Sequence, residues 1–286
     1  MISIGKSIDN YSKKISFKLF NKNTSLLWAI FNQFIHKLII KKNKNDNRLN
    51  NFLRDGFLKL DEKFLEEVNF INNQRIIDKK DIGRQFYALG EEDKNRLISS
   101  LERKLNPLFC DLKETYKSEV YLGDVRIWRN FNIDGIKKEK NIYSEDFHTD
   151  GYLCTYLKIH VNLMDVKHED GPLNIIKKNF TQNFIDDFKY KNRREYKDIN
   201  PKEVEYLIVN TGKKGDAILF DSSNCYHRAT IPNNFRDMMQ LTILIHPKKL
   251  EKFYVGDKFL RINTKPNFIN TLLLMYKHLI YKFYKI

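Results

Sequence analysis

Phe147-His148-Thr149-Asp150-Gly151 is the stretch around which we expect the rest of the chain to be organised. On a β-strand, alternate side chains point to the same face, so His148 and Asp150 would project together. A second histidine, His227, stands far downstream, and Arg236 follows it. Two imidazoles and one carboxylate can occupy one face of an octahedral metal ion and leave three positions open, which suits non-haem iron(II) and oxygen chemistry. The pattern therefore predicts a metal site formed by His148, Asp150 and His227.

Alternating strands surround this motif in the sequence. Residues 156–163 are apolar at odd positions and polar at even ones. In a final strand over residues 236–245, one face carries Met239, Leu241, Ile243 and Ile245, and the other carries Arg236, Met238, Gln240 and Thr242. A Gly-Asp turn leads into a short apolar strand at 217–220. If the even positions of the first strand look into a cavity, Lys158 and Asn162 can touch a ligand. The other interpretation is a half-exposed strand with a wet outer face.

The spacing of apolar residues predicts the remaining elements, with proline ending helices and period-two patterns marking strands. These elements are a strand at 57–60, a helix carrying Phe64, Val68 and Ile71 on one side, a helix over 91–105 ending near Pro107, strand-like stretches at 120–122 and 125–129, and an irregular insertion at 178–200 with some helix at 181–189.

The two ends of the chain differ from its centre. Residues 1–50 are predicted to form a helical extension and linker, residues 51–248 the main domain, and residues 249–286 a basic amphipathic helix. Helices packed on the domain are the favoured interpretation of both ends, and helices on a membrane surface are the alternative. The longest apolar stretch, residues 26–40, is too short and too interrupted for a transmembrane helix.

Composition narrows the class of protein. The chain has 286 residues, 42% of them hydrophobic, and a formal net charge of +15. This charge favours anionic substrates, a lipid-linked substrate or peripheral contact with an anionic membrane, and we expect no nucleic-acid partner. Cys110, Cys154 and Cys225 are widely spaced, without a Cys-x-x-Cys pair, and no signal peptide is evident. We therefore expect reduced thiols in a cytoplasmic protein.

The chain resembles the phytanoyl-CoA dioxygenase family over roughly residues 50–247. The resemblance is carried by Asp55-Gly56-Phe57, Phe147-His148-Thr149-Asp150, residues 161–166, Asp170-Gly171-Pro172-Leu173, residues 215–221, His227-Arg228 and Arg236. It implies a mainly β (α+β) protein with a double-stranded β-helix core, a jelly roll of the cupin-like kind. It also implies Fe(II), 2-oxoglutarate and O2 as reactants, and hydroxylation of a small-molecule, sugar- or lipid-linked substrate with release of succinate and CO2.

Individual roles follow from the same resemblance. His148, Asp150 and His227 would hold the iron, and Arg236 would bind the distal carboxylate of 2-oxoglutarate, with Lys158 as a further candidate. A guanidinium suits that role because it pairs with a carboxylate through two parallel hydrogen bonds. Many relatives have a serine where this chain has Ala229. Either Thr230 or Thr242 replaces its contact, or the contact is absent.

Plainer interpretations stand beside these roles. The three metal-ligand candidates could be a surface histidine, a capping aspartate and a core histidine, and Arg236 an ordinary ion-pair partner. Arg126, Trp128 and Arg129 could line a pocket or belong to an edge strand, while Cys225 is expected to be a small core residue and His160 receives no role. For the whole protein, the alternatives are a metal-binding jelly roll without catalysis and a peripheral membrane protein.

Overall fold

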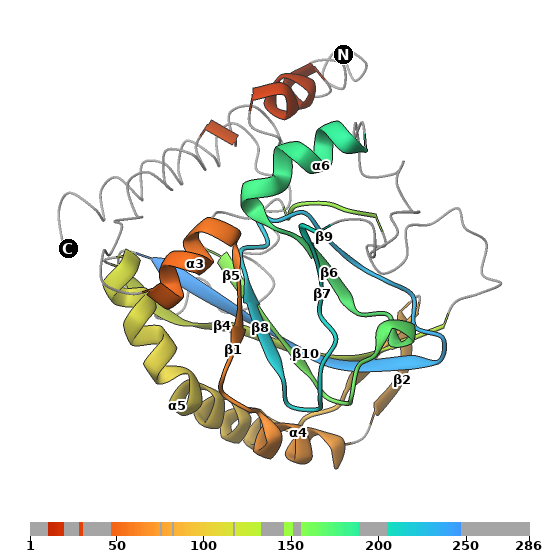
Figure 1. The fold of residues 1–286 in the computed structure, drawn as a ribbon. Coiled ribbons are helices and arrows are strands. Elements are labelled where there is room, and N and C mark those ends of the chain that lie inside the picture. Colours follow the sequence, from red (N-terminus) through yellow and green to blue (C-terminus); the bar gives the residue numbers. More distant parts are fainter. Residues whose placement is uncertain are drawn as a thin grey trace, which may run out of the picture.

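The computed structural model describes residues 11–19, 29–30, 47–74, 76–81, 83–116, 118–132, 146–150, 156–188 and 205–246. Two antiparallel sheets face each other, with helices on the outside (Figure 1). Besides a helical stretch at residues 11–19, the helices of the described residues include α3 (Asn47–Asp55), α4 (Leu65–Asn72), α5 (Glu91–Tyr116) and α6 (Thr181–Asp187), with single 3-10 turns at His168–Asp170 and Lys178–Phe180.

The larger sheet has seven strands in the order β1-β8-β5-β10-β4-β3-β2, and the smaller has three in the order β7-β6-β9. The strands of the larger sheet are β1 (Phe57–Leu60), β8 (Ala217–Phe220), β5 (Tyr156–Asn162), β10 (Phe235–His246), β4 (Glu119–Phe131), β3 (Arg84–Tyr87) and β2 (Ile76–Asp81). Those of the smaller sheet are β7 (Leu207–Val209), β6 (Leu173–Ile176) and β9 (His227–Ala229).

From β4 onward the chain passes back and forth between the two sheets. It leaves β4 in the large sheet, pairs at His148 with β9 of the small sheet, returns as β5, and then supplies β6 and β7 to the small sheet. It ends with β8 in the large sheet, β9 in the small one and β10 in the large one. This winding is a double-stranded β-helix. The prediction of an α+β protein with a jelly-roll core is therefore confirmed.

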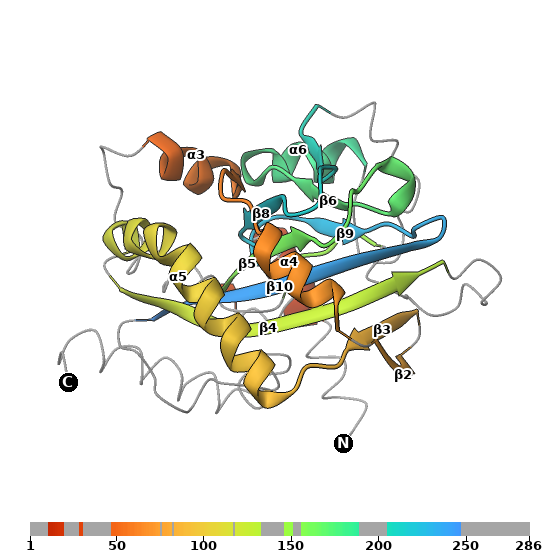
Figure 2. The same ribbon diagram turned by 90° about the horizontal axis from the view of Figure 1, so that it is seen from below.

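The main core lies between the large sheet and the helices α3, α4 and α5, which cover one of its faces (Figure 2). Leu157, Ile159 and Val161 of β5 are fully buried there, as the alternation predicts. β10 alternates likewise, with Met239, Leu241 and Ile243 in the same core. Because successive side chains of a strand point to opposite faces, the polar positions of both strands must face the small sheet.

One prediction about the first half of the chain is wrong. The helix predicted over 91–105 does not end near Pro107 but continues, as α5, to Tyr116. Leu105, Leu108 and Leu112 extend its buried stripe past the proline, and their burial offsets the backbone hydrogen bond that proline cannot donate.

The strand-like stretches at 120–122 and 125–129 are one strand, β4, with an irregularity at Gly123. Thr242 pairs with Asp124 and Ile243 with Leu122, so Gly123 is the extra residue of a β-bulge. A Cβ on Gly123 would lie 2.5 Å from the Leu244 side chain, which explains the glycine. β4 is also not an edge strand, because it runs between β10 and β3.

The hairpin of β2 and β3 has no counterpart in the predicted elements. It adds two strands beside β4, and Gly83 between them has φ +74°, a conformation that favours glycine. Helix α6 falls within the segment predicted to be partly helical, and α3 spans the predicted boundary at residue 50.

The basic helix predicted over 249–286 and most of the extension predicted over 1–50 lie outside the described residues. Within the described residues, no helix combines the length and apolar character needed to cross a bilayer.

Candidate active site

His148 and His227 meet through their main chains. His148 N donates to His227 O at 3.0 Å and His227 N donates to His148 O at 2.9 Å, so the two residues form a bridge between adjacent strand segments. Asp150 N donates to Ser222 O at 2.8 Å, which fixes the next residue on the same face. Phe147 anchors the segment from behind, since it is fully buried with its ring centroid 5.2 Å from that of Phe184 on α6.

The side chains of His148, Asp150 and His227 converge on one point. Each offers a ligand atom, and these atoms all lie within 4.8 Å of one another. Asp150 Oδ1 is 3.9 Å from His148 Nε2, and Asp150 Oδ2 is 3.8 Å from His227 Nε2. The structure thus brings together the three residues that the sequence proposed as metal ligands.

The hydrogen bonds of the two rings fix which nitrogen can bind a metal. His148 Nδ1 lies 2.9 Å from Asp146 O, and His227 Nδ1 lies 3.0 Å from Cys225 O. A carbonyl oxygen only accepts, so each Nδ1 carries the proton and each Nε2 presents its lone pair toward Asp150. Backbone partners of this kind orient metal-binding histidines. The donor set therefore fits a divalent transition metal.

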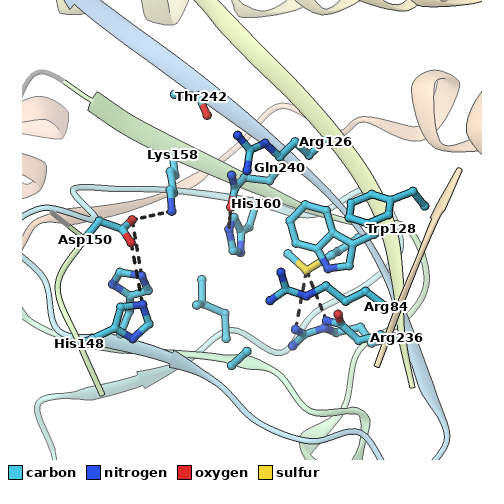
Figure 3. Close-up of a pocket in the computed structure, with 16 residues that line it drawn as sticks. Arg84, Arg126, Trp128, His148, Asp150, Lys158, His160, Arg236, Gln240 and Thr242 are labelled. Atoms are coloured by element: carbon cyan, nitrogen blue, oxygen red, sulfur yellow. Dashed lines mark hydrogen bonds and ion pairs between the residues drawn. The ribbon is translucent and has the colours of Figure 1, made fainter. Parts of the chain in front are cut away.

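Lys158 lies beside the same carboxylate. Its Nζ donates to Asp150 Oδ2 at 2.5 Å (Figure 3). Burial alone would raise the pKa of Asp150, but the positive charge of Lys158 and its hydrogen bond to the carboxylate outweigh it and hold that pKa well below its ordinary value. The carboxylate is therefore ionised and ready to act as a metal ligand.

These residues form one end of a pocket of about 250 Å³ between the two sheets. Its lining consists of Arg84, Phe86, Arg126, Trp128, Asn130, His148, Asp150, Lys158, His160, Leu173, His227, Ala229, Arg236, Met238, Gln240 and Thr242. Most of them come from the face of the large sheet opposite the helix-covered one.

Strand register orders this face into rows. Arg236 of β10 pairs with Asn130 of β4, which pairs with Arg84 of β3. In the next row Met238, Trp128 and Phe86 pair in the same way. Further along β10, Gln240 lies between Arg126 and His160, and Thr242 lies opposite Lys158.

Arg236 and Lys158 lie at opposite ends of this face of the large sheet. Arg236 is buried, 4% exposed, with its Nη2 3.7 Å from Met238 Sδ. The register separates it from Lys158 by roughly 20 Å of strand, and Lys158 is the one that reaches the metal-ligand candidates. The roles of both residues toward 2-oxoglutarate stay predictions.

The structure decides between several interpretations that the sequence left open for residues of β4, β5 and position 225. The polar face of β5 looks into the pocket rather than to solvent, although Asn162 is not part of the lining. Arg126 and Trp128 line the pocket, whereas Arg129 points the other way and forms a two-bond ion pair with Asp237, both bonds 2.7 Å. Cys225 is a buried core residue, as expected.

Thr230 does not take the place of the serine that many relatives have at position 229. The Thr230 hydroxyl donates to Pro172 O at 3.0 Å, away from the pocket, whereas Thr242 lines it.

Sequence reasoning missed two pocket residues of importance. His160 stands two positions after Lys158, so strand alternation alone could have placed it in the pocket. Its Nε2 lies 3.1 Å from Gln240 Oε1, and burial, assisted by the charge of Lys158, lowers its pKa well below the ordinary value, so the ring is neutral. Arg84 had no comparable signal, because the hairpin that carries it was not predicted.

No protein-family model matches the sequence, and no curated protein does. Among solved structures, HygX from Streptomyces hygroscopicus, with nickel, 2-oxoglutarate and hygromycin B bound, is 15% identical over 70% of this chain and 87% of its own, with a TM-score of 0.45. EctD from S. alaskensis is 18% identical over 77% and 86% of the two chains, with a TM-score of 0.46.

SnoN, a non-haem α-ketoglutarate-dependent epimerase from nogalamycin biosynthesis, is 14% identical over 69% of this chain and 81% of its own, with a TM-score of 0.43. At these identities the function must be inferred from the residues of this chain.

Proposed function

We propose that this chain is an Fe(II)- and 2-oxoglutarate-dependent oxygenase. The observation that carries the proposal is the convergence of two imidazole Nε2 atoms and one carboxylate within 4.8 Å, at one end of a pocket whose lining also contains a buried arginine. Two histidines and one carboxylate on one face of a metal, with the other positions open, are the ligand set of non-haem iron(II) oxygenases.

Each residue has a role that its position supports. His148, Asp150 and His227 hold the metal, and Arg236 binds the distal carboxylate of 2-oxoglutarate. A guanidinium stays charged when buried and offers a planar fork, so it can pair with a carboxylate through two bonds. When bound, iron and 2-oxoglutarate supply the oxidising power, with decarboxylation of the co-substrate to succinate and CO2.

The rest of the pocket prepares the site for these ligands. Lys158 keeps the Asp150 carboxylate ionised and oriented. The neutral His160, held by Gln240, and the apolar side chains of Leu173 and Met238 complete the walls without adding a competing charge. Apolar walls of this kind limit water near the reacting atoms.

The finer assignments are part of the same proposal. The expected outcome is hydroxylation of a C–H bond in a small-molecule, sugar- or lipid-linked substrate, with O2 as the second reactant. Membership of the phytanoyl-CoA dioxygenase family remains a prediction from the sequence motifs. The rival function, a metal-binding jelly roll without catalysis, differs from the proposal in an outcome that can be measured.

The test has two stages. Anaerobic addition of Fe(II) and 2-oxoglutarate to the purified chain should produce a weak visible charge-transfer band, and admitting oxygen should convert 2-oxoglutarate slowly to succinate. Both signals should disappear in His148→Ala and persist in His168→Ala, a histidine outside the pocket lining. Metal binding without any oxygen-dependent succinate, across a broad substrate screen, would favour the non-catalytic alternative.

A further inference from the structure

A cross-strand row of polar residues lines the pocket away from the metal-ligand candidates. Arg236 of β10 pairs in register with Asn130 of β4, which pairs with Arg84 of β3, and all three line the pocket. Figure 3 shows Arg84 and Arg236 on the side of the pocket away from His148 and Asp150. Because neighbouring strands lie about 5 Å apart, the row places one neutral amide between two positions that carry a guanidinium.

The side-chain amide of Asn130 has poor hydrogen-bond partners. Asn130 is 2% exposed, and its Nδ2 donates to Met238 Sδ at 3.9 Å. Within the described part of the chain, its Oδ1 accepts no hydrogen bond. A thioether sulfur is only a weak acceptor, and buried amides in native proteins normally have stronger partners because an unsatisfied one is unfavourable. Asn130 is therefore a buried donor whose bonding would improve if a ligand brought an oxygen acceptor.

Arg236 donates to the same sulfur. Its Nη2 lies 3.7 Å from Met238 Sδ, so N–H donors from β4 and β10 converge on one atom. A carboxylate oxygen is a much stronger acceptor than a thioether, and its bonds to a guanidinium are charge-assisted. Methionine is unbranched and has three rotatable bonds, so its sulfur can move aside. The position of Met238 Sδ thus marks a point where one carboxylate can accept hydrogen bonds from both Asn130 and Arg236.

The other candidates for a second contact beside Arg236 do not reach this point. Ala229 has only a methyl side chain, and the hydroxyl of Thr230 is bonded to a backbone carbonyl. Thr242 lies six residues after Arg236 on β10, which separates the two by about 20 Å of strand. Asn130 is paired directly with Arg236. Of these side chains, Asn130 is the one placed to share a carboxylate with Arg236.

We propose that Asn130 is a second binding residue for the distal carboxylate of 2-oxoglutarate, in place of the serine that many relatives have at position 229. Its Nδ2 donates to one carboxylate oxygen while Arg236 pairs with the group through its guanidinium. This inference rests on the proposed function, which makes 2-oxoglutarate the ligand and Arg236 its anchor. A neutral donor strengthens the binding without placing a third positive charge in a row that already contains Arg84 and Arg236.

The test compares two 2-oxo acids. 2-Oxobutyrate has the same metal-chelating end as 2-oxoglutarate but ends in a methyl group where 2-oxoglutarate has its distal carboxylate. Anaerobic titration of each acid at fixed Fe(II), followed by the charge-transfer band, gives its dissociation constant. Asn130→Ala should weaken 2-oxoglutarate about tenfold or more, as expected for loss of a hydrogen bond to a charged group. It should leave 2-oxobutyrate within about twofold, whereas a general distortion of the pocket would weaken both acids alike.

A second variant and two controls accompany Asn130→Ala. Asn130→Asp keeps the shape of the side chain and should weaken 2-oxoglutarate more than Asn130→Ala does. The new carboxylate would pair with Arg236 and repel that of the ligand. Asn95→Ala and Arg103→Lys, substitutions of exposed residues of α5 outside the pocket lining, should bind both acids as the parent does.

The emission of Trp128 gives a second measurement that needs neither iron nor oxygen. Met238 is the register partner of Trp128, so displacement of its thioether changes the surroundings of that ring. The chain has two tryptophans, and Trp28→Phe leaves Trp128 as the single tryptophan emitter. Titrating the Ni(II)-loaded Trp28→Phe protein with 2-oxoglutarate at constant ionic strength should give a saturable change in emission. Adding Asn130→Ala in this background should weaken binding by about the same factor as in the iron titration.

The outcomes separate this inference from the proposed function. The inference is overturned if both Asn130 variants bind 2-oxoglutarate with the dissociation constant of the parent. It is also overturned if they lose 2-oxobutyrate as strongly as 2-oxoglutarate. A parent chain that binds 2-oxoglutarate but forms no succinate in oxygen would remove the proposed oxygenase activity, while the titrations would still decide the role of Asn130. A parent chain that binds no 2-oxoglutarate in either measurement would overturn both.

Discussion

His148 and His227 are hydrogen-bonded to each other through both main chains, at 3.0 and 2.9 Å, although they lie far apart in the sequence. A paired register of this kind places their rings on the same face, with centroids 4.5 Å apart. A shift of the register by one residue would turn one ring to the opposite face of the sheet. The metal site is therefore a property of strand pairing as much as of the residues themselves.

Lys158→Met should lower the stability of the metal-free chain and increase the stabilisation that a bound metal provides. Without a metal, Lys158 provides the positive charge beside the buried Asp150 carboxylate. Its loss should destabilise the metal-free chain by about 1–3 kcal/mol. Bound Fe(II) or Ni(II) would then replace that charge without competition, so the metal-induced rise in melting temperature should exceed that of the parent. Thermal unfolding with and without metal measures both effects. Equal melting temperatures of the metal-free parent and the metal-free variant would contradict the expected destabilisation.

Arg236→Lys should weaken 2-oxoglutarate binding while leaving metal binding intact. Lysine keeps the charge but loses the fork that pairs with a carboxylate, and we expect a loss of about tenfold or more. Anaerobic titration of 2-oxoglutarate at fixed Fe(II), followed by the charge-transfer band, measures the change. Arg103→Lys serves as the control. An unchanged midpoint in Arg236→Lys would show that the distal carboxylate is bound elsewhere.

Glu67→Gln should destabilise the chain in a pH-dependent way. Glu67 of α4 is 2% exposed, accepts a hydrogen bond from Ser100 at 2.7 Å and pairs with Lys104 at 2.9 Å. Burial would raise the pKa of Glu67, but these two partners outweigh it and lower that pKa below its ordinary value. The stabilisation is therefore fully present above the unfolded pKa, near 4.3, and is lost as the pH falls through the lower folded value.

The measurement is urea unfolding at neutral pH and at about pH 4. We expect Glu67→Gln to cost about 1–3 kcal/mol at neutral pH and less in acid. Glu102→Gln, on the exposed side of α5, should change little at either pH. A difference that grew on acidification would show that the ionised form is not the stabilising one.

Gly171→Ala should lower the free energy of unfolding, whereas Gly90→Ala should leave it nearly unchanged. Gly171 has φ +69°, and an added Cβ would lie 2.5 Å from Thr230 O and 2.6 Å from Pro232 N, both of them backbone atoms. Relief requires movement of the segment that joins β9 to β10, so we expect a loss of about 1–3 kcal/mol. At Gly90 the nearest atom to an added Cβ is 3.9 Å away, which makes it the matched control. Equal midpoints of denaturant unfolding for the two variants would refute the expected difference.

Local pattern was enough to predict much of this protein. Alternation in β5 and β10 gave the buried face and the polar face correctly, because strand geometry fixes which side chains share a side. The same rule put His148 and Asp150 together. The chemistry of two imidazoles and a carboxylate then indicated a metal site, independently of any contact across the fold.

The tertiary structure alone decided which distant strands meet and in what register. It brought His227 onto His148, turned Lys158 toward Asp150, and used the unpredicted hairpin to place Arg84 over Trp128. It also carried α5 through Pro107, since a continuous buried stripe outweighs one missing hydrogen bond. Residue spacing describes the faces of one element at a time, whereas pairing between elements depends on the packing free energy of the whole chain.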